Sequence, residues 1–385
     1  MHRQHVFVSY EWYCPIAKDS DALLGSVIRG REHGADEIMD GFEVIEPLIG
    51  ETWVVDGRVA VSPPGDTDAL YIRPMLHERG MVPSGTKVLH SLVLDNNVLS
   101  DMTQCRRSAN IDYLISLLRS KPLELNPTMA MLEQRQGFVG ASQALHDFAE
   151  LLGKRFGAWD AKKNASSFDK ALEDAKSGLA ENVTLLSGYL PAILYLYHQA
   201  GSAEYKLEWL SGLVRSVDLP FLQLPFYLAA LLFLAKEEPA LFRKKVLVKV
   251  RKDTKLMPSL DRQKKSILNL GHDVMLPAAA LFPANTQGTM VFPYIATRDY
   301  LLQDFLAEVR CGAVVMQQNG GANGAWELNP GGRLHEKLGA AIARCLPHRE
   351  HPGSETEKSI RRGNLRAFSD SYLEKCVALK HTAPP

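Results

Sequence analysis

An apolar run from Val88 to Leu94 leads without interruption into the acidic residue Asp95. A short apolar run of this kind predicts a strand that is buried in a sheet. A strand that ends in a carboxylate places it at the carboxyl edge of the sheet, where open α/β sheets bind their ligands. Asp95 is therefore the first candidate for a functional residue.

Strands and helices alternate on both sides of a long helical region. The periodicity predicts, in order, a helix over 111–118, a strand over 123–125, a helix from about 128, helical residues through 141–242, a helix that opens at Asp273, a strand that ends at Thr297, a helix over 301–309 and a strand over 313–316. Pro293 is expected to shorten its strand, because proline cannot donate to a central ladder. The alternation favours an α/β fold with a parallel central sheet.

The same pattern divides the chain into five regions. They are a small N-terminal α+β module at 1–84, the first part of the α/β domain at 85–138, a large all-α insertion at 139–264, the second part of the α/β domain at 265–320 and a C-terminal extension, partly disordered, at 321–385. Within the first region, Asp56-Gly57 lies between two β-rich runs and predicts a hairpin.

Composition excludes several classes of protein. The chain has 44 basic and 44 acidic residues, so it has no overall charge that would attract it to nucleic acid or to an anionic membrane. Five widely spaced cysteines form no CxxC pair and indicate reduced thiols, and the N-terminus has no secretory pattern, so we expect a cytoplasmic protein. The apolar stretch from Leu219 to Ala235 contains two prolines and is expected to be a buried helix of a soluble protein without a membrane span.

Four acidic residues lie at positions typical of a site at a sheet edge. Asp95 follows a strand, Glu133 falls on a helix, Asp273 opens a helix and Asp299 follows a strand. Each has an ordinary alternative: Asp273 as a helix cap, Glu133 as a solvated helix residue and Asp299 as a partner of Arg298. If the four converge, their charges repel one another unless a cation neutralises them, and oxygen ligands of this kind suit Mg²⁺ or Mn²⁺.

The order of these motifs resembles that of PIN-like nucleases, which include the toxin ribonucleases of bacterial toxin–antitoxin pairs. The family's strand followed by Asp-x-Asn-Val-Leu is matched by 95–99, its helical Glu by Glu133, its helix-opening Asp by Asp273, and its Thr-Arg-Asp by 297–299. The sequence departs from the family at Asn96, where a small hydroxyl residue is usual, and in the length of the insertion. Glu124 competes with Glu133 for the role of the helical acid.

The resemblance implies a three-layer α/β/α domain and a set of functional residues. Asp95, Glu133, Asp273 and Asp299 would bind Mg²⁺ or Mn²⁺ and carry catalysis, with Asn97 and Thr297 as supporting residues. Asn97 could hold Asp95 by a hydrogen bond, or be a simple turn amide. Arg298 could contact phosphate or pair with a nearby acid.

A basic segment precedes Asp273. From Arg243 to Lys265 there are ten Lys or Arg and two Asp, a local excess of about +8 that is sufficient for several phosphate contacts. The candidate contacts in this segment are Lys249, Arg251, Lys252, Arg262, Lys264 and Lys265. The alternative is a solvated face of the helical insertion.

These observations predict a metal-dependent endonuclease that acts on nucleic acid, RNA rather than DNA. Two alternatives stay open: an inactive PIN-like scaffold that binds RNA or a protein, and a DNA nuclease that acts in defence against invading DNA. A regulatory protein partner and a homo-oligomer are both compatible with the sequence.

Overall fold

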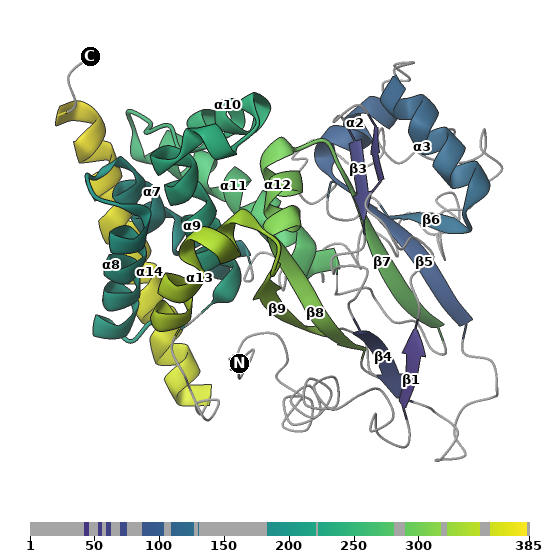
Figure 1. Cartoon of the computed structure of the whole chain (residues 1–385). Coiled ribbons are helices and arrows are strands. Elements are labelled where there is room, and N and C mark those ends of the chain that lie inside the picture. Colours follow the sequence, from purple (N-terminus) through teal and green to yellow (C-terminus); the bar gives the residue numbers. More distant parts are fainter. Residues whose placement is uncertain are drawn as a thin grey trace.

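The computed structural model describes residues 42–45, 53–55, 59–62, 70–74, 87–103, 109–126, 130, 183–220, 222–280, 289–316, 322–346 and 355–382. These residues form a mixed α/β structure with two sheets, in which helix is the larger share (Figure 1). The predicted helical residue Glu133 lies outside the described residues, as does the first part of the predicted helical region, 141–182.

The larger sheet has five strands in the order β2-β3-β7-β5-β6. Their bounds are Trp53–Val55 for β2, Val59–Ser62 for β3, Lys87–Leu94 for β5, Leu123–Asn126 for β6 and Thr289–Thr297 for β7. Strand β5 pairs in parallel with both β6 and β7, which confirms the parallel pairing predicted from the alternation. The sheet as a whole is mixed, because β3 pairs with β7 in the antiparallel direction.

The hairpin predicted at Asp56-Gly57 is confirmed, since β2 and β3 pair antiparallel with Val55 opposite Val59. Strand β3 then joins β7, so this part of the region assigned to an N-terminal module completes the larger sheet. Helices α2 (Asn96–Thr103) and α3 (Ala109–Ser120) connect β5 to β6.

A second sheet has the order β1-β4-β8-β9, with β1 at Phe42–Ile45, β4 at Leu70–Pro74, β8 at Val309–Met316 and β9 at Ala322–Leu328. Strand β4 is parallel to β8, and the two outer pairs are antiparallel. Strands from the first 84 residues therefore contribute to both sheets. Strand β9 belongs to the C-terminal extension, in which partial disorder was expected.

Pro293 does not shorten β7, which corrects the expectation from the sequence. The strand runs over nine residues with Pro293 in its interior, opposite Ser91 of β5. Strand β3 pairs with β7 only over Ile295 to Thr297. At Pro293, β7 therefore has a described partner strand, β5, on one side only. A proline is tolerated at such a position, as it is at a sheet edge, because its missing N–H can face the other side.

The helical part packs beside the sheets (Figure 1). It comprises α7 (Leu190–His198), α8 (Ala203–Ser216), α9 (Gln223–Glu237), the short η3 (Pro239–Leu241), α10 (Lys244–Asp253), α11 (Leu260–Ala280), α12 (Tyr300–Glu308), α13 (Arg333–Cys345) and α14 (Glu355–Thr382). Helix α13 packs on α8 and α9, and α14 packs on α7 and α11. The C-terminal extension is therefore helical over these residues and completes the helical part.

Helix α9 is the buried centre of this part, and its residues from Gln223 to Ala235 are all buried. This confirms the buried helix predicted for the apolar stretch. None of the helices in the described part of the chain has the length and apolar character to cross a membrane.

Helix α11 begins at Leu260, well before Asp273. The expected helix opening at Asp273 is therefore wrong, and so is the alternative of a helix cap. Ile267, Leu270 and Val274 are buried at helical spacing. This apolar stripe continues through the position at which a new helix was predicted.

Candidate functional site

Asp95 occupies the junction between β5 and α2. Its backbone N–H donates to the carbonyl of Ala296 on β7 at 2.9 Å, and its own carbonyl accepts from the N–H groups of Val98 and Leu99 at 2.9 Å. Because β7 and α2 both hold its backbone, the buried side chain of Asp95 has a fixed position at the carboxyl edge of β5 and β7.

Two side chains support the Asp95 carboxylate. The hydroxyl of Thr297 donates to its Oδ2 at 2.7 Å, and the amide of Asn97 donates to the same oxygen at 3.3 Å. Burial raises the pKa of Asp95, and the charge of Asp299 raises it further, whereas the hydrogen bonds from Thr297 and Asn97 act in the opposite direction. Asp95 is thus an oriented acid with a raised pKa.

Asp299 caps the N-terminus of α12. Its Oδ1 accepts from the N–H groups of Leu301 at 2.8 Å and Leu302 at 3.1 Å. Its backbone N–H donates to the Thr297 hydroxyl at 3.0 Å, so Thr297 connects Asp299 to Asp95. The remaining oxygen, Oδ2, lies 2.6 Å from the Nζ of Lys249.

Lys249 of α10 brings three carboxylates together. In addition to Asp299, its Nζ lies 2.9 Å from Oδ2 of Asp253 and 3.3 Å from Oδ2 of Asp273. The Lys249 side chain is 21% exposed, while those of Asp253, Asp273 and Asp299 are 10%, 22% and 4% exposed. The cluster therefore joins α10, α11 and the start of α12 in a largely enclosed place.

The cluster has more negative than positive charge. Burial, together with the charges of its acidic neighbours, raises the pKa of Asp273 to about 8 despite the opposing charge of Lys249. Burial alone would lower the pKa of Lys249, but the three carboxylates outweigh it and raise the pKa, so Lys249 remains an ammonium. One ammonium faces three carboxylates, so negative charge is in excess. A proton bound to Asp273 reduces this excess of negative charge.

The donor set suits a hard divalent cation. Asp95, Asp273 and Asp299 provide carboxylate oxygens, and Mg²⁺ and Mn²⁺ prefer such ligands. The charge excess at the cluster favours a further cation. However, no group of three or more His, Cys, Asp or Glu side chains within the described ranges has a metal-binding arrangement, and Lys249 lies between two of the acids.

The described residues place the other predicted acid, Glu124, inside β6. Glu124 pairs with Ser91 of β5, and Ser91 lies four residues before Asp95. Glu124 therefore does not lie at the carboxyl edge of the sheet, and Glu133, its competitor, falls outside the described residues.

The predicted basic contacts separate into two groups. Arg298 forms an ion pair with Asp101 of α2, and Lys249 faces the carboxylates instead of the surface. The other five are exposed: Arg251, Lys252, Arg262, Lys264 and Lys265. These five lie on α10 and α11 and are called the exposed basic residues below.

Sequence reasoning missed Asp253 and the position of Lys249 within the cluster. The two are four residues apart on α10, a spacing that places them on one helix face, and it could have indicated their pairing. Nothing in the local sequence indicates that this face turns toward Asp273 and Asp299.

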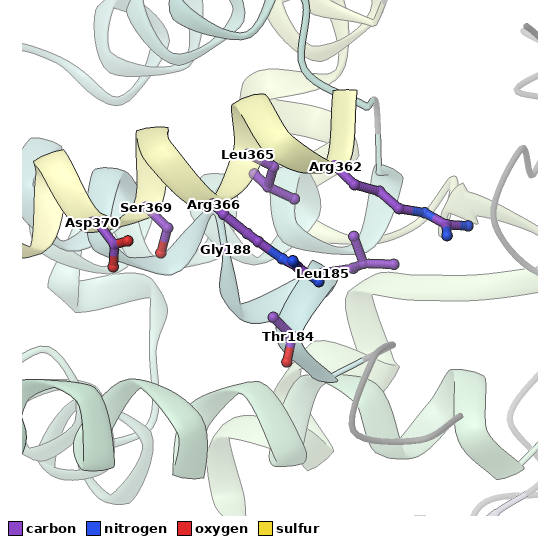
Figure 2. Close-up of a pocket in the computed structure, with 8 residues that line it drawn as sticks. All are labelled: Thr184, Leu185, Gly188, Arg362, Leu365, Arg366, Ser369 and Asp370. Carbon is purple, nitrogen blue, oxygen red and sulfur yellow. The ribbon is translucent and has the colours of Figure 1, made fainter. Parts of the chain in front are cut away.

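A separate cavity lies between α14 and the segment that precedes α7 (Figure 2). Its lining residues are Thr184, Leu185, Gly188, Arg362, Leu365, Arg366, Ser369 and Asp370. None of the candidate acids lines it.

Comparisons with protein-family models, with curated proteins and with solved structures gave no match to this chain.

Proposed function

We propose that the protein is a metal-dependent endonuclease that hydrolyses phosphodiester bonds in RNA, built on a PIN-like plan. One observation carries the proposal. Three acids singled out by their sequence positions, Asp95, Asp273 and Asp299, lie in one connected network. Thr297 links Asp95 to Asp299, and Lys249 links Asp299 to Asp273.

The chain's own residues would hold and orient the reacting groups. Asp95, Asp273 and Asp299 would bind Mg²⁺ or Mn²⁺, and the resemblance adds Glu133. When bound, such an ion lowers the pKa of water and offsets the charge of the phosphodiester. Thr297 and Asn97 keep the Asp95 carboxylate pointed at the site, and the backbone of α12 fixes Asp299.

The exposed basic residues would contact the substrate backbone. Arg251 and Lys252 are exposed on α10, the helix that carries Lys249 into the acidic cluster. Phosphate contacts of this type are electrostatic and insensitive to sequence, so affinity should fall as salt rises. RNA is the proposed substrate because the family that the motifs resemble includes ribonucleases.

The test is cleavage of labelled single-stranded RNA by the purified full chain in Mn²⁺. The wild-type protein should cut, and Asp95→Asn and Asp273→Asn should not, because each loses a carboxylate that would bind the ion. Thr297→Val should cut about 10- to 100-fold more slowly, the usual effect of removing a group that orients a ligand.

Asp261→Asn is the matched control, because Asp261 is an exposed acid in the first turn of the same helix as Asp273. It should cut like the wild-type protein. If Asp95→Asn and Asp273→Asn also cut at the wild-type rate, the proposal is wrong. A labelled DNA of the same sequence tests the DNA-nuclease alternative in the same assay.

One observation favours an inactive scaffold. Lys249 already provides a positive charge to Asp273 and Asp299, so these acids are partly neutralised without a metal. Mn²⁺ titration by calorimetry separates the alternatives. An inactive scaffold should give no heat that depends on Asp95, and the proposed enzyme should give heat that disappears in Asp95→Asn.

A further inference from the structure

Lys249 reaches the oxygens that a cation would need. Each carboxylate oxygen has about two acceptor positions. Oδ1 of Asp299 already accepts from two backbone N–H groups, so Oδ2 is its remaining ligand atom. That atom lies 2.6 Å from the Lys249 Nζ, and Oδ2 of Asp273 lies 3.3 Å from the same nitrogen.

We propose that Lys249 is an internal counter-ion that competes with a divalent cation for Asp273 and Asp299, so that the site alternates between a lysine-held and a metal-held form. This inference rests on the proposed function, and it adds a regulatory element to the same site. A divalent ion and an ammonium repel each other at such short distances. Metal binding through Asp299 Oδ2 therefore requires Lys249 to withdraw.

Asp253 gives Lys249 a partner after it withdraws. It is four residues further along α10, and its Oδ2 lies 2.9 Å from the lysine nitrogen. Because both residues belong to one helix, the pair can persist while the contacts to α11 and α12 are broken. Lys249 would then keep a carboxylate partner when it leaves Asp273 and Asp299.

The lysine-held form also keeps the protein assembled without metal. The three carboxylates belong to α10, α11 and the N-terminus of α12, and their mutual repulsion opposes the packing of these helices. Lys249 offsets this repulsion when no divalent ion is present. The cost is weaker metal affinity, since part of the binding free energy is used to displace the lysine.

The first test is Mn²⁺ titration of the metal-free full chain by calorimetry. Lys249→Met removes the competing charge with a side chain of similar length, and it should bind Mn²⁺ at least tenfold more tightly than the wild-type protein. Lys249→Arg keeps the charge and should bind within about threefold of the wild-type protein. Equal or weaker binding by Lys249→Met overturns the inference.

The second test uses the wild-type protein and is independent of the folding of any variant. A lysine acylating reagent is applied with and without Mn²⁺, and each lysine is followed by peptide mass spectrometry. Lys249 should react slowly without metal, because it is ion-paired and largely enclosed, and several-fold faster with Mn²⁺. The exposed Lys252 on the same helix should react equally in both conditions. An unchanged Lys249 rate contradicts the inference.

The two proposals fail in different ways. If the wild-type protein does not cut RNA, the proposed function is wrong, but a tighter Mn²⁺ affinity of Lys249→Met would still support competition. If the wild-type protein cuts RNA and Lys249→Met binds Mn²⁺ no more tightly, the function stands and the competition does not exist.

Discussion

Asp273 shows how one residue can make the stability of a fold depend on pH. It lies in the interior of α11, where burial and its acidic neighbours raise its pKa to about 8. An unfolded chain would lose this proton near pH 4. Between these values the folded state binds more protons than the unfolded state, so stability decreases as pH rises.

We therefore predict that, in the presence of a chelator, Asp273→Asn removes part of the pH dependence of stability. The free energy of unfolding of the wild-type protein relative to Asp273→Asn should fall as pH rises from about 4 to about 8, and then level off. Urea unfolding at a series of pH values measures this difference. The exposed Asp261→Asn should keep the wild-type slope, and a flat difference for Asp273→Asn would contradict the assignment.

At the scale of elements, two glycines allow close packing around the segment that leads into α7. An added Cβ at Gly188 would lie 2.8 Å from Cγ of Leu365 on α14. At Gly271 of α11, it would lie 2.9 Å from Cβ of Ser187. The segment therefore contacts two helices at once, and Gly271 sets the position of α11 two residues before Asp273.

Gly188→Ala should destabilise the protein by about 1–3 kcal/mol, because overpacking displaces Leu365 and the backbone around it. Gly212→Ala is the control, since Gly212 is an exposed residue of α8 with no atom within 4 Å of an added Cβ. It should stabilise the helix by about 0.5–1 kcal/mol. Urea unfolding compares the two variants, and equal effects would show that the contact with Leu365 relaxes freely.

At the scale of the whole molecule, Arg333 of α13 connects α12 to the residues of and after η3. It donates to Asp304 and Glu308, each at 2.6 Å, and to the carbonyl of Leu241 at 3.0 Å. Its guanidinium also lies 4.4 Å from the ring centroid of Phe242. Because α12 begins at Asp299, this contact supports the element that carries the site.

Arg333→Met should destabilise the protein by about 3–5 kcal/mol, since it leaves the buried carboxylates of Asp304 and Glu308 without their main partner. Lys337 lies on the same helix as Arg333 and forms an exposed ion pair with Glu238, the residue that follows α9, so Lys337→Met should leave stability nearly unchanged. Thermal and urea unfolding measure both. A loss below 1 kcal/mol for Arg333→Met would mean that Arg243, 3.6 Å from Asp304, takes over its role.

The sequence alone determined the elements whose signals are local. The apolar run before Asp95, the hairpin at Asp56-Gly57 and the buried α9 were all predicted, because strand length, turn residues and apolar composition are properties of neighbouring residues. The position of Asp299 soon after a strand was predicted as well, whereas its role as the cap of α12 was not.

Only the tertiary structure decided where α11 begins and which side chains meet Lys249. Asp273 resembles a helix cap in the sequence, but α11 continues through it, and Gly271 in the same helix allows a close contact with Ser187. Lys249 belongs to a basic segment and is nevertheless enclosed by acids from three elements. Such contacts join residues that are distant in the chain, so no local pattern can specify them.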